Sequence, residues 1–111
     1  MDGRQIQEIV HREIGAEWGT TNLHGVNLRE AVIFPEPVTV IARAVEDGEL
    51  SDTLMDAWIV LVENPRTRSG YRIVAASDGS TFGLAGEGFP TDQHLVLVGW
   101  YGGFLKTFLA M

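Results

Sequence analysis

The sequence predicts an α+β domain with an N-terminal helix, about five mostly antiparallel strands in one sheet, and a short C-terminal helix. Apolar residues recur at helical spacing only near the two ends of the chain. Between the ends, apolar and β-branched runs are separated by short turns that contain glycine, aspartate or proline. No helical pattern lies between these runs, which favours antiparallel pairing with the helices gathered on one face.

The length and composition of the chain limit the classes of protein that it can belong to. Its 111 residues fit one domain, residues 1–111. It contains no cysteine, which excludes disulfides, thiol nucleophiles and cysteine-ligated metal sites. The first residues lack the apolar run of a signal peptide, and no stretch approaches the roughly 20 apolar residues that span a bilayer. We therefore expect a cytoplasmic protein without a membrane partner.

The first helix is predicted from an apolar stripe near the N-terminus. Asp2 is the expected N-cap, and Gly15 is the expected residue at which the helix ends in a left-handed conformation. The stripe is expected to pack on the sheet. Its members are Ile6, Ile9, Val10 and Ile14.

Residues 15–37 are predicted to form a long irregular connection, because glycine and proline recur in them. Four apolar side chains are expected to anchor it to the core: Trp18, Leu23, Val26 and Leu28. A short strand at residues 31–34 is expected to end at Pro35, since proline cannot donate a hydrogen bond to a strand ladder.

Two long strands are predicted next, at residues 38–45 and 54–63, with a turn at residues 46–49. The second strand is apolar on both faces, which places it in the middle of the sheet. Strict alternation assigns Trp58, Val60 and Val62 to one face and Ala57, Ile59 and Leu61 to the other.

The remaining elements follow from turn signals. Residues 71–76 and 80–85 flank Asp78-Gly79, a strong hairpin signal because both turn residues need a positive φ. A last strand is predicted at residues 94–98, followed by a sharp turn at Gly102-Gly103. The closing helix is predicted from one apolar face: Phe104, Leu105, Phe108 and Leu109.

The sequence shows no arrangement typical of catalysis or metal binding. No serine lies in a nucleophile elbow, and His11, His24 and His94 lack the close spacing of metal ligands. A glycine-rich stretch at residues 83–88 lacks the lysine of a phosphate loop. We therefore expect no cofactor, no metal and no enzymatic activity.

The charge of the chain points away from nucleic acid. The formal net charge is -7, and an acidic protein is repelled by phosphate. Arg66, Arg68 and Arg72 cluster, but their expected use is pairing with the protein's own carboxylates. The acidic balance suits either a basic partner or simple solubility.

Two features are candidate binding residues. Five carboxylates lie in residues 46–56 with no lysine or arginine among them: Glu46, Asp47, Glu49, Asp52 and Asp56. They form either a solvated hairpin tip or a docking patch for a basic protein. Trp100 and Tyr101, between glycines, are either interface aromatics or a cover for the end of the sheet.

Several stretches together resemble a known class of protein. They are residues 35–38, 56–65, 70–74, 82–85 and 99–104, with Met111. Over roughly residues 30–111 the chain resembles small bacterial immunity proteins, the cytoplasmic partners that neutralise polymorphic or contact-dependent growth-inhibition toxins. The resemblance implies protein binding without catalysis. It also implies a cognate toxin domain, often a basic nuclease, as the partner.

Two alternatives remain open at this point. The chain could be a small enzyme or ligand-binding domain whose site forms in space from His24, His94 and nearby carboxylates. It could also be a self-associating module, since an edge strand at residues 38–45 could pair with a second copy. An immunity protein would be a monomer or a weak dimer.

Overall fold

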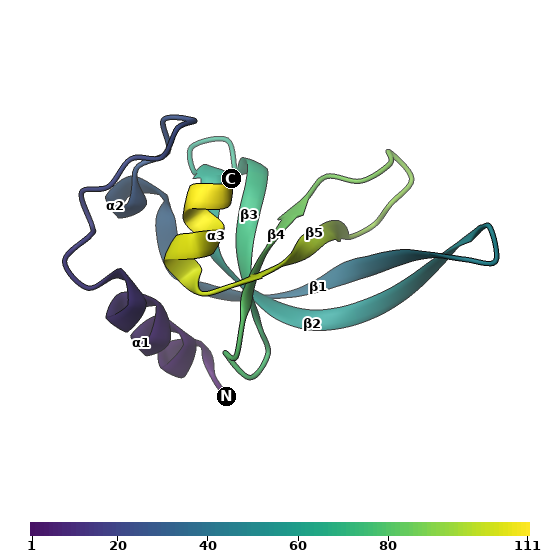
Figure 1. The fold of residues 1–111 in the computed structure, drawn as a ribbon, viewed down its shortest axis with the longest axis horizontal. Helices are drawn as coiled ribbons and strands as arrows, with labels where there is room; N and C mark the ends of the chain where they lie inside the picture. The colour runs from purple at the N-terminus through teal and green to yellow at the C-terminus, as the bar shows by residue number, and fades with distance from the viewer.

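A computed structural model describes all of residues 1–111 and confirms the α+β class. An N-terminal helix is followed by five mostly antiparallel strands that close into a small barrel and by a short C-terminal helix (Figure 1). The elements are α1 Gly3–Ile14, α2 Leu28–Ala31, β1 Val32–Glu46, β2 Glu49–Asn64, β3 Ser69–Ala76, β4 Phe82–Gly86, β5 Leu95–Gly102 and α3 Phe104–Ala110. None of the helices combines the length and the hydrophobicity that crossing a membrane requires.

The barrel is closed by one short parallel seam. Successive strands from β1 to β5 pair antiparallel. β1 then pairs with β5 in parallel at Val40↔Leu95 and Ile41↔Val96. The sequence predicts the strands but not this closure, because the seam joins segments that are far apart in the chain and leaves no local pattern.

Two apolar clusters divide the core between the inside of the barrel and the helices. The inner cluster contains strand residues only: Val40, Ala57, Ile59, Val62, Val74 and Ala85. The outer cluster joins the helices to the opposite faces of β2, β3 and β4, and includes Ile6, Val10, Leu61, Ile73, Phe82 and Phe104. All three helices contribute to the outer cluster, so they cover the same side of the barrel, as predicted.

Helix α1 has the predicted ends. Asp2 accepts a hydrogen bond from the Gln5 N–H, and the Gln5 side chain accepts one from the Asp2 N–H, which completes a capping box. At the other end Gly15 ends the helix as predicted and donates its N–H to the His11 carbonyl. Its φ of 56° is positive, but with a ψ of -117° the residue does not adopt the predicted left-handed helical conformation. The apolar stripe of the helix faces the outer cluster, as expected from its spacing.

Removing the cap is expected to destabilise the protein modestly. Asp2→Ala leaves the Gln5 N–H without its partner, and loss of such a cap costs about 1 kcal/mol of the free energy of unfolding. Urea denaturation measures the change. Glu8→Ala on the exposed face of the same helix is the control, expected to change stability by less than about 0.5 kcal/mol. Equal effects of the two substitutions would contradict the capping assignment.

The predicted stop at Pro35 is wrong, because β1 runs through it from Val32 to Glu46. The register between β1 and β2 shifts between Val32 and Glu36, so buried Pro35 lies in an irregular part of the ladder. Pro37 lies opposite Trp58. On its other edge β1 pairs with β5 only at residues 40 and 41. Pro37 therefore removes no hydrogen bond between strands on that edge, although it has no N–H to donate.

The central position of β2 is confirmed, but its faces alternate differently from the prediction. A register shift between Ile59 and Leu61 places Leu61 with Val60 in the outer cluster and Val62 in the inner one. The extra residue of such a bulge reverses the sides that later residues face. The strand also begins at Glu49, before the predicted start at residue 54.

The long connection is anchored differently from the prediction. Leu23 is 98% exposed, whereas Val26 and Leu28 are buried and Trp18 is half-buried. Asn22 is the additional anchor, because its side chain accepts the N–H groups of residues 24 and 26 and donates to the carbonyl of residue 108. The short helix α2 within this segment is also unpredicted, and Asn27 caps it.

The two Asp-Gly turns adopt different conformations. At residues 47–48 both Asp47 and Gly48 have positive φ, of 51° and 79°, which is typical of the two-residue hairpin turn. At residues 78–79 only Gly79 has a positive φ, and the Ala76 N–H donates to the Thr81 carbonyl across a longer loop. The hairpin predicted at 78–79 is confirmed, but its turn type is not.

Candidate functional site

The β1–β2 hairpin extends well beyond the barrel. The last contact of β1 with β5 is at Ile41, and β2 first pairs with β3 at Ala57. Residues 42–56 therefore form a two-stranded ribbon with no strand on either side, which we call the arm. Figure 1 shows the arm projecting from the barrel on the side opposite the helices.

Three of the five predicted carboxylates gather at the tip of the arm. Glu46 and Glu49 pair directly across the strands, and Asp47 occupies the turn between them. All three are exposed, and none makes an ion pair with a lysine, arginine or histidine. The tip is therefore an uncompensated concentration of negative charge.

The other two predicted carboxylates have different environments. Asp52 forms an ion pair with Arg43, with the Arg43 Nε 2.8 Å from Asp52 Oδ1. Asp56 lies opposite Thr39 near the root of the arm, exposed to solvent. Of the predicted patch, only the three tip residues act as one charged group.

One face of the arm carries three exposed apolar side chains on either side of the Arg43–Asp52 ion pair. Val45 and Leu50 pair directly across the strands, and Leu54 lies four residues after Leu50, so all three point to the same side. Their exposed fractions are 70%, 61% and 60%. This apolar group was not predicted, because the strand pattern alone does not show which side chains on this face stay uncovered.

Arg43 fixes the root of the arm to the β4–β5 loop. Its guanidinium donates to both oxygens of Asp52 and to both oxygens of Asp92, and it lies 5.1 Å from the centre of the Phe89 ring. Asp92 also accepts the Phe89 N–H at 2.6 Å. The hydrogen bonds from Arg43 lower the pKa of Asp52 and of Asp92 below the ordinary carboxyl value.

These lowered pKa values make the contribution of Arg43 to stability depend on pH. A carboxyl whose pKa is lower in the folded protein stabilises it above the unfolded pKa of about 3.9 and loses that effect as the pH falls through the folded value. Arg43→Met is therefore expected to lower stability near neutral pH, and the difference from the unsubstituted protein is expected to shrink below about pH 4.

Urea denaturation at about pH 7 and about pH 2.5 measures this difference. Arg68→Met is the control, because the pair between Arg68 and Glu36 is exposed on both sides and such pairs contribute little. A destabilisation by Arg43→Met that stayed constant down to the lower pH would exclude the proposed role of the two aspartates.

Trp100 and Tyr101 do not form an exposed aromatic patch. Both are half-buried, and as neighbours on β5 they pack on opposite sides. Trp100 packs against the inner cluster, and Tyr101 packs against the outer one. Their contacts are those of side chains that cover the two cores at the end of the sheet.

Two of the three clustered arginines, Arg68 and Arg72, pair with the protein's own acceptors as predicted, whereas Arg66 makes no such contact. Arg68 contacts Glu36 at 2.6 Å. Arg72 contacts Glu87 at 3.3 Å and donates to the carbonyls of Gly70 and Arg68. These contacts use the charge of Arg68 and Arg72 within the fold.

The histidines do not converge on one site. His94 lines a small groove with Glu87 and Asp92, whereas His24 is exposed in the long connection and does not line that groove. His11 packs edge-on against Trp18, with ring centres 5.0 Å apart. No three histidine or carboxylate side chains lie close enough to hold a metal ion.

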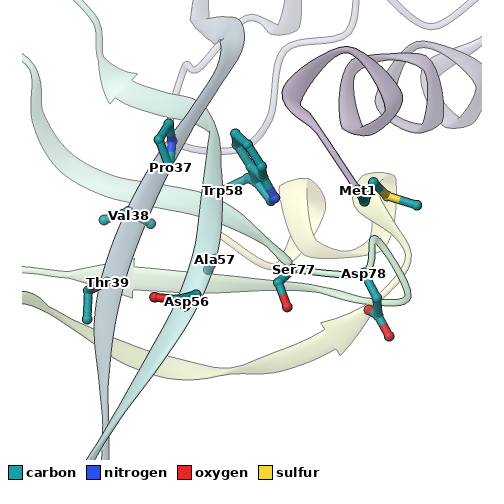
Figure 2. Close-up of a pocket in the computed structure, with 9 residues that line it drawn as sticks. All are labelled: Met1, Pro37, Val38, Thr39, Asp56, Ala57, Trp58, Ser77 and Asp78. Atoms are coloured by element: carbon teal, nitrogen blue, oxygen red, sulfur yellow. The ribbon is translucent and has the colours of Figure 1, made fainter.

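The largest groove lies at the root of the arm and has a volume of about 800 Å³. It is lined by residues 37–39 of β1, residues 56–58 of β2, Ser77 and Asp78 in the turn after β3, and Met1 (Figure 2). The carboxylates of Asp56 and Asp78 point in different directions in this view, so they do not meet at one reacting atom. The groove is open to solvent and lies beside β1 and β2.

Comparison with protein-family models, with curated proteins and with solved structures finds no match to this chain.

Proposed function

We propose that this protein is a binding domain that docks a basic partner protein through the arm. The observation that carries the proposal is the exposure of the apolar side chains of Val45, Leu50 and Leu54 beside the unpaired tip carboxylates. They flank the Arg43–Asp52 ion pair on one face of the arm. These large apolar side chains lie in water in the free protein. Binding of a partner that covers them is favourable, because it removes apolar surface from water. The tip would steer a basic partner to this face.

We further propose that the partner is a toxin domain and that the chain acts as its immunity protein in the cytoplasm. The net charge of -7 supports a basic partner such as a nuclease, whose substrate is itself anionic. The resemblance of residues 30–111 to immunity proteins supports the same class. Such a protein inhibits by occupying the toxin, so the chain itself needs no catalytic group.

The product of the neighbouring gene is the first partner to test. We expect a one-to-one complex in calorimetry and suppression of that protein's toxicity when both are expressed. The triple substitution Val45→Thr, Leu50→Thr and Leu54→Thr is expected to weaken the complex by roughly tenfold or more, because it removes the apolar contact while threonine retains a high preference for strands. Leu23→Ser, at another exposed leucine, is the control.

The role of the tip is tested separately. Glu46→Gln, Asp47→Asn and Glu49→Gln remove three charges, and asparagine tolerates the positive φ of residue 47. This variant is expected to associate more slowly and with less dependence on salt. The control removes three exposed charges on the helix side: Glu8→Gln, Glu17→Gln and Glu30→Gln. Identical association rates for the two variants would remove the tip from the interface.

Self-association is the second candidate, and the unpaired edges of the arm favour it. Light scattering at increasing concentration distinguishes the two. A dimer that forms through the arm at micromolar concentration would support the second candidate, and a strict monomer would exclude it.

A further inference from the structure

We infer that the partner docks by strand addition, with an extended segment that carries lysine or arginine pairing with the open edge of β2 over residues 49–56. This inference rests on the proposed function and specifies how the partner is held. Strand addition gives affinity through main-chain hydrogen bonds and specificity through alternate side chains.

The first support is that this edge of β2 has no neighbour. Pairing with β3 begins at Ala57↔Ala76, and the chain then turns away through residues 77–81 into β4. In an antiparallel strand every second residue directs both its N–H and its C=O away from the existing partner. Residues 49–56 therefore present a row of main-chain groups to solvent.

The register identifies which residues these are. A two-residue turn makes its flanking residues, Glu46 and Glu49, a hydrogen-bonded pair, so the even-numbered residues that follow face outward. The other end of the strand agrees with this assignment. Ala76 directs its N–H to the Thr81 carbonyl, so Ala75 is the residue that faces β2, opposite Trp58. The outward residues are Leu50, Asp52, Leu54 and Asp56.

The second support is the space at the end of this edge. The groove of about 800 Å³ lies where β3 leaves β2. It is lined by residues 56–58 of β2, by residues 37–39 of the neighbouring β1, by Ser77 and Asp78 of the turn, and by Met1. Figure 2 shows this turn set apart from the β2 backbone. An added strand that runs along this edge of the arm would end at the groove.

The third support is charge, which selects the occupant. No lysine or arginine occurs between Arg43 and Arg66, and this segment contains the three tip carboxylates and Asp56. The free edge of β1 is a poorer site, because Arg43 on that strand is bound to Asp92 of the β4–β5 loop. A basic segment on β2 compensates the unpaired charge and places its apolar side chains beside Leu50 and Leu54.

Amide hydrogen exchange, followed by NMR on the complex with the product of the neighbouring gene, tests the inference. The outward amides of Leu50, Asp52, Leu54 and Asp56 are expected to exchange at least about tenfold more slowly in the complex, because they gain hydrogen bonds. The amide of Ser51, already paired with β1, is the internal control. A complex in which the four outward amides keep their free rates would overturn strand addition and leave the proposed function standing. Failure to form any complex would remove both.

A substitution pair at one position separates the backbone from the side chain. Leu54→Pro removes the outward N–H, whereas Leu54→Thr removes only the apolar contact, and circular dichroism verifies that both fold. We expect Leu54→Pro to weaken the complex roughly tenfold more than Leu54→Thr does. Equal affinities would count against the added strand. Protection of the same amides in the free protein, rising with its concentration, would identify a second copy as the occupant and overturn the assignment to a basic partner.

Discussion

Gly83→Ala is expected to lower the free energy of unfolding by roughly 3 kcal/mol or more. Gly83 is buried in β4 opposite Trp100 of β5. A Cβ atom at this position would overlap the carbonyl oxygen of Gly99 and lie 2.9 Å from the Trp100 ring. The Gly99 contact is with backbone, so the added methyl group cannot be accommodated by rotating a side chain, and the two strands must move apart.

Gly99→Ala is the matched control for this prediction. Gly99 lies across the same strand pair, but a Cβ atom there meets only the Tyr101 ring, at 3.9 Å. This distance is an ordinary contact, so we expect a change of less than about 0.5 kcal/mol. Urea denaturation compares the two variants. If Gly83→Ala were as stable as Gly99→Ala, the close approach of β4 to β5 would be incorrect.

Phe104→Ala is expected to lower the free energy of unfolding by about 3–5 kcal/mol. Phe104 is fully buried and packs edge-to-face on Phe82, with ring centres 5.6 Å apart. The substitution leaves a cavity where α3 meets β4 in the outer cluster. It preserves the hydrogen bond from the Phe104 N–H to Glu13 Oε1 at 2.8 Å, so the measured loss is that of the ring.

The control for this prediction is Leu109→Ala on the same helix. Leu109 is 59% exposed, so its truncation is expected to change stability by less than about 0.5 kcal/mol. Thermal and urea denaturation of both variants check the difference. Similar losses at the two positions would contradict the packing of Phe104 in the outer cluster.

The sequence correctly predicted those features of the fold that depend only on residues close together in the chain. The cap at Asp2, the end of α1 at Gly15 and the tight turn at Gly102, with a φ of 98°, are set by neighbouring backbone. The errors lie where a distant strand decides the outcome. Pro35 could stay within β1 because the register is irregular there, and Leu61 changed sides because of a bulge against β3.

The candidate site was predicted in part for the same reason. The tip carboxylates form a sequence cluster, so composition alone reveals them. The exposure of Leu50 and Leu54 depends on where β3 stops, and nothing in residues 49–56 encodes the end of another strand at Ala76. Conversely, the partial burial of Trp100 and Tyr101 depends on two cores that the sequence does not separate.

The parallel seam between β1 and β5 has a consequence for the order in which the protein folds. The hairpins join residues that are close in the chain and can form within microseconds, whereas the seam must bring Val40 to Leu95 and closes a long loop. The seam is therefore expected to form after the rate-limiting step. Leu95→Ala should then accelerate unfolding in stopped-flow measurements while leaving the refolding rate nearly unchanged. Assembly of the barrel thus proceeds from its hairpins towards a final closure that joins the middle of the chain to its last strand.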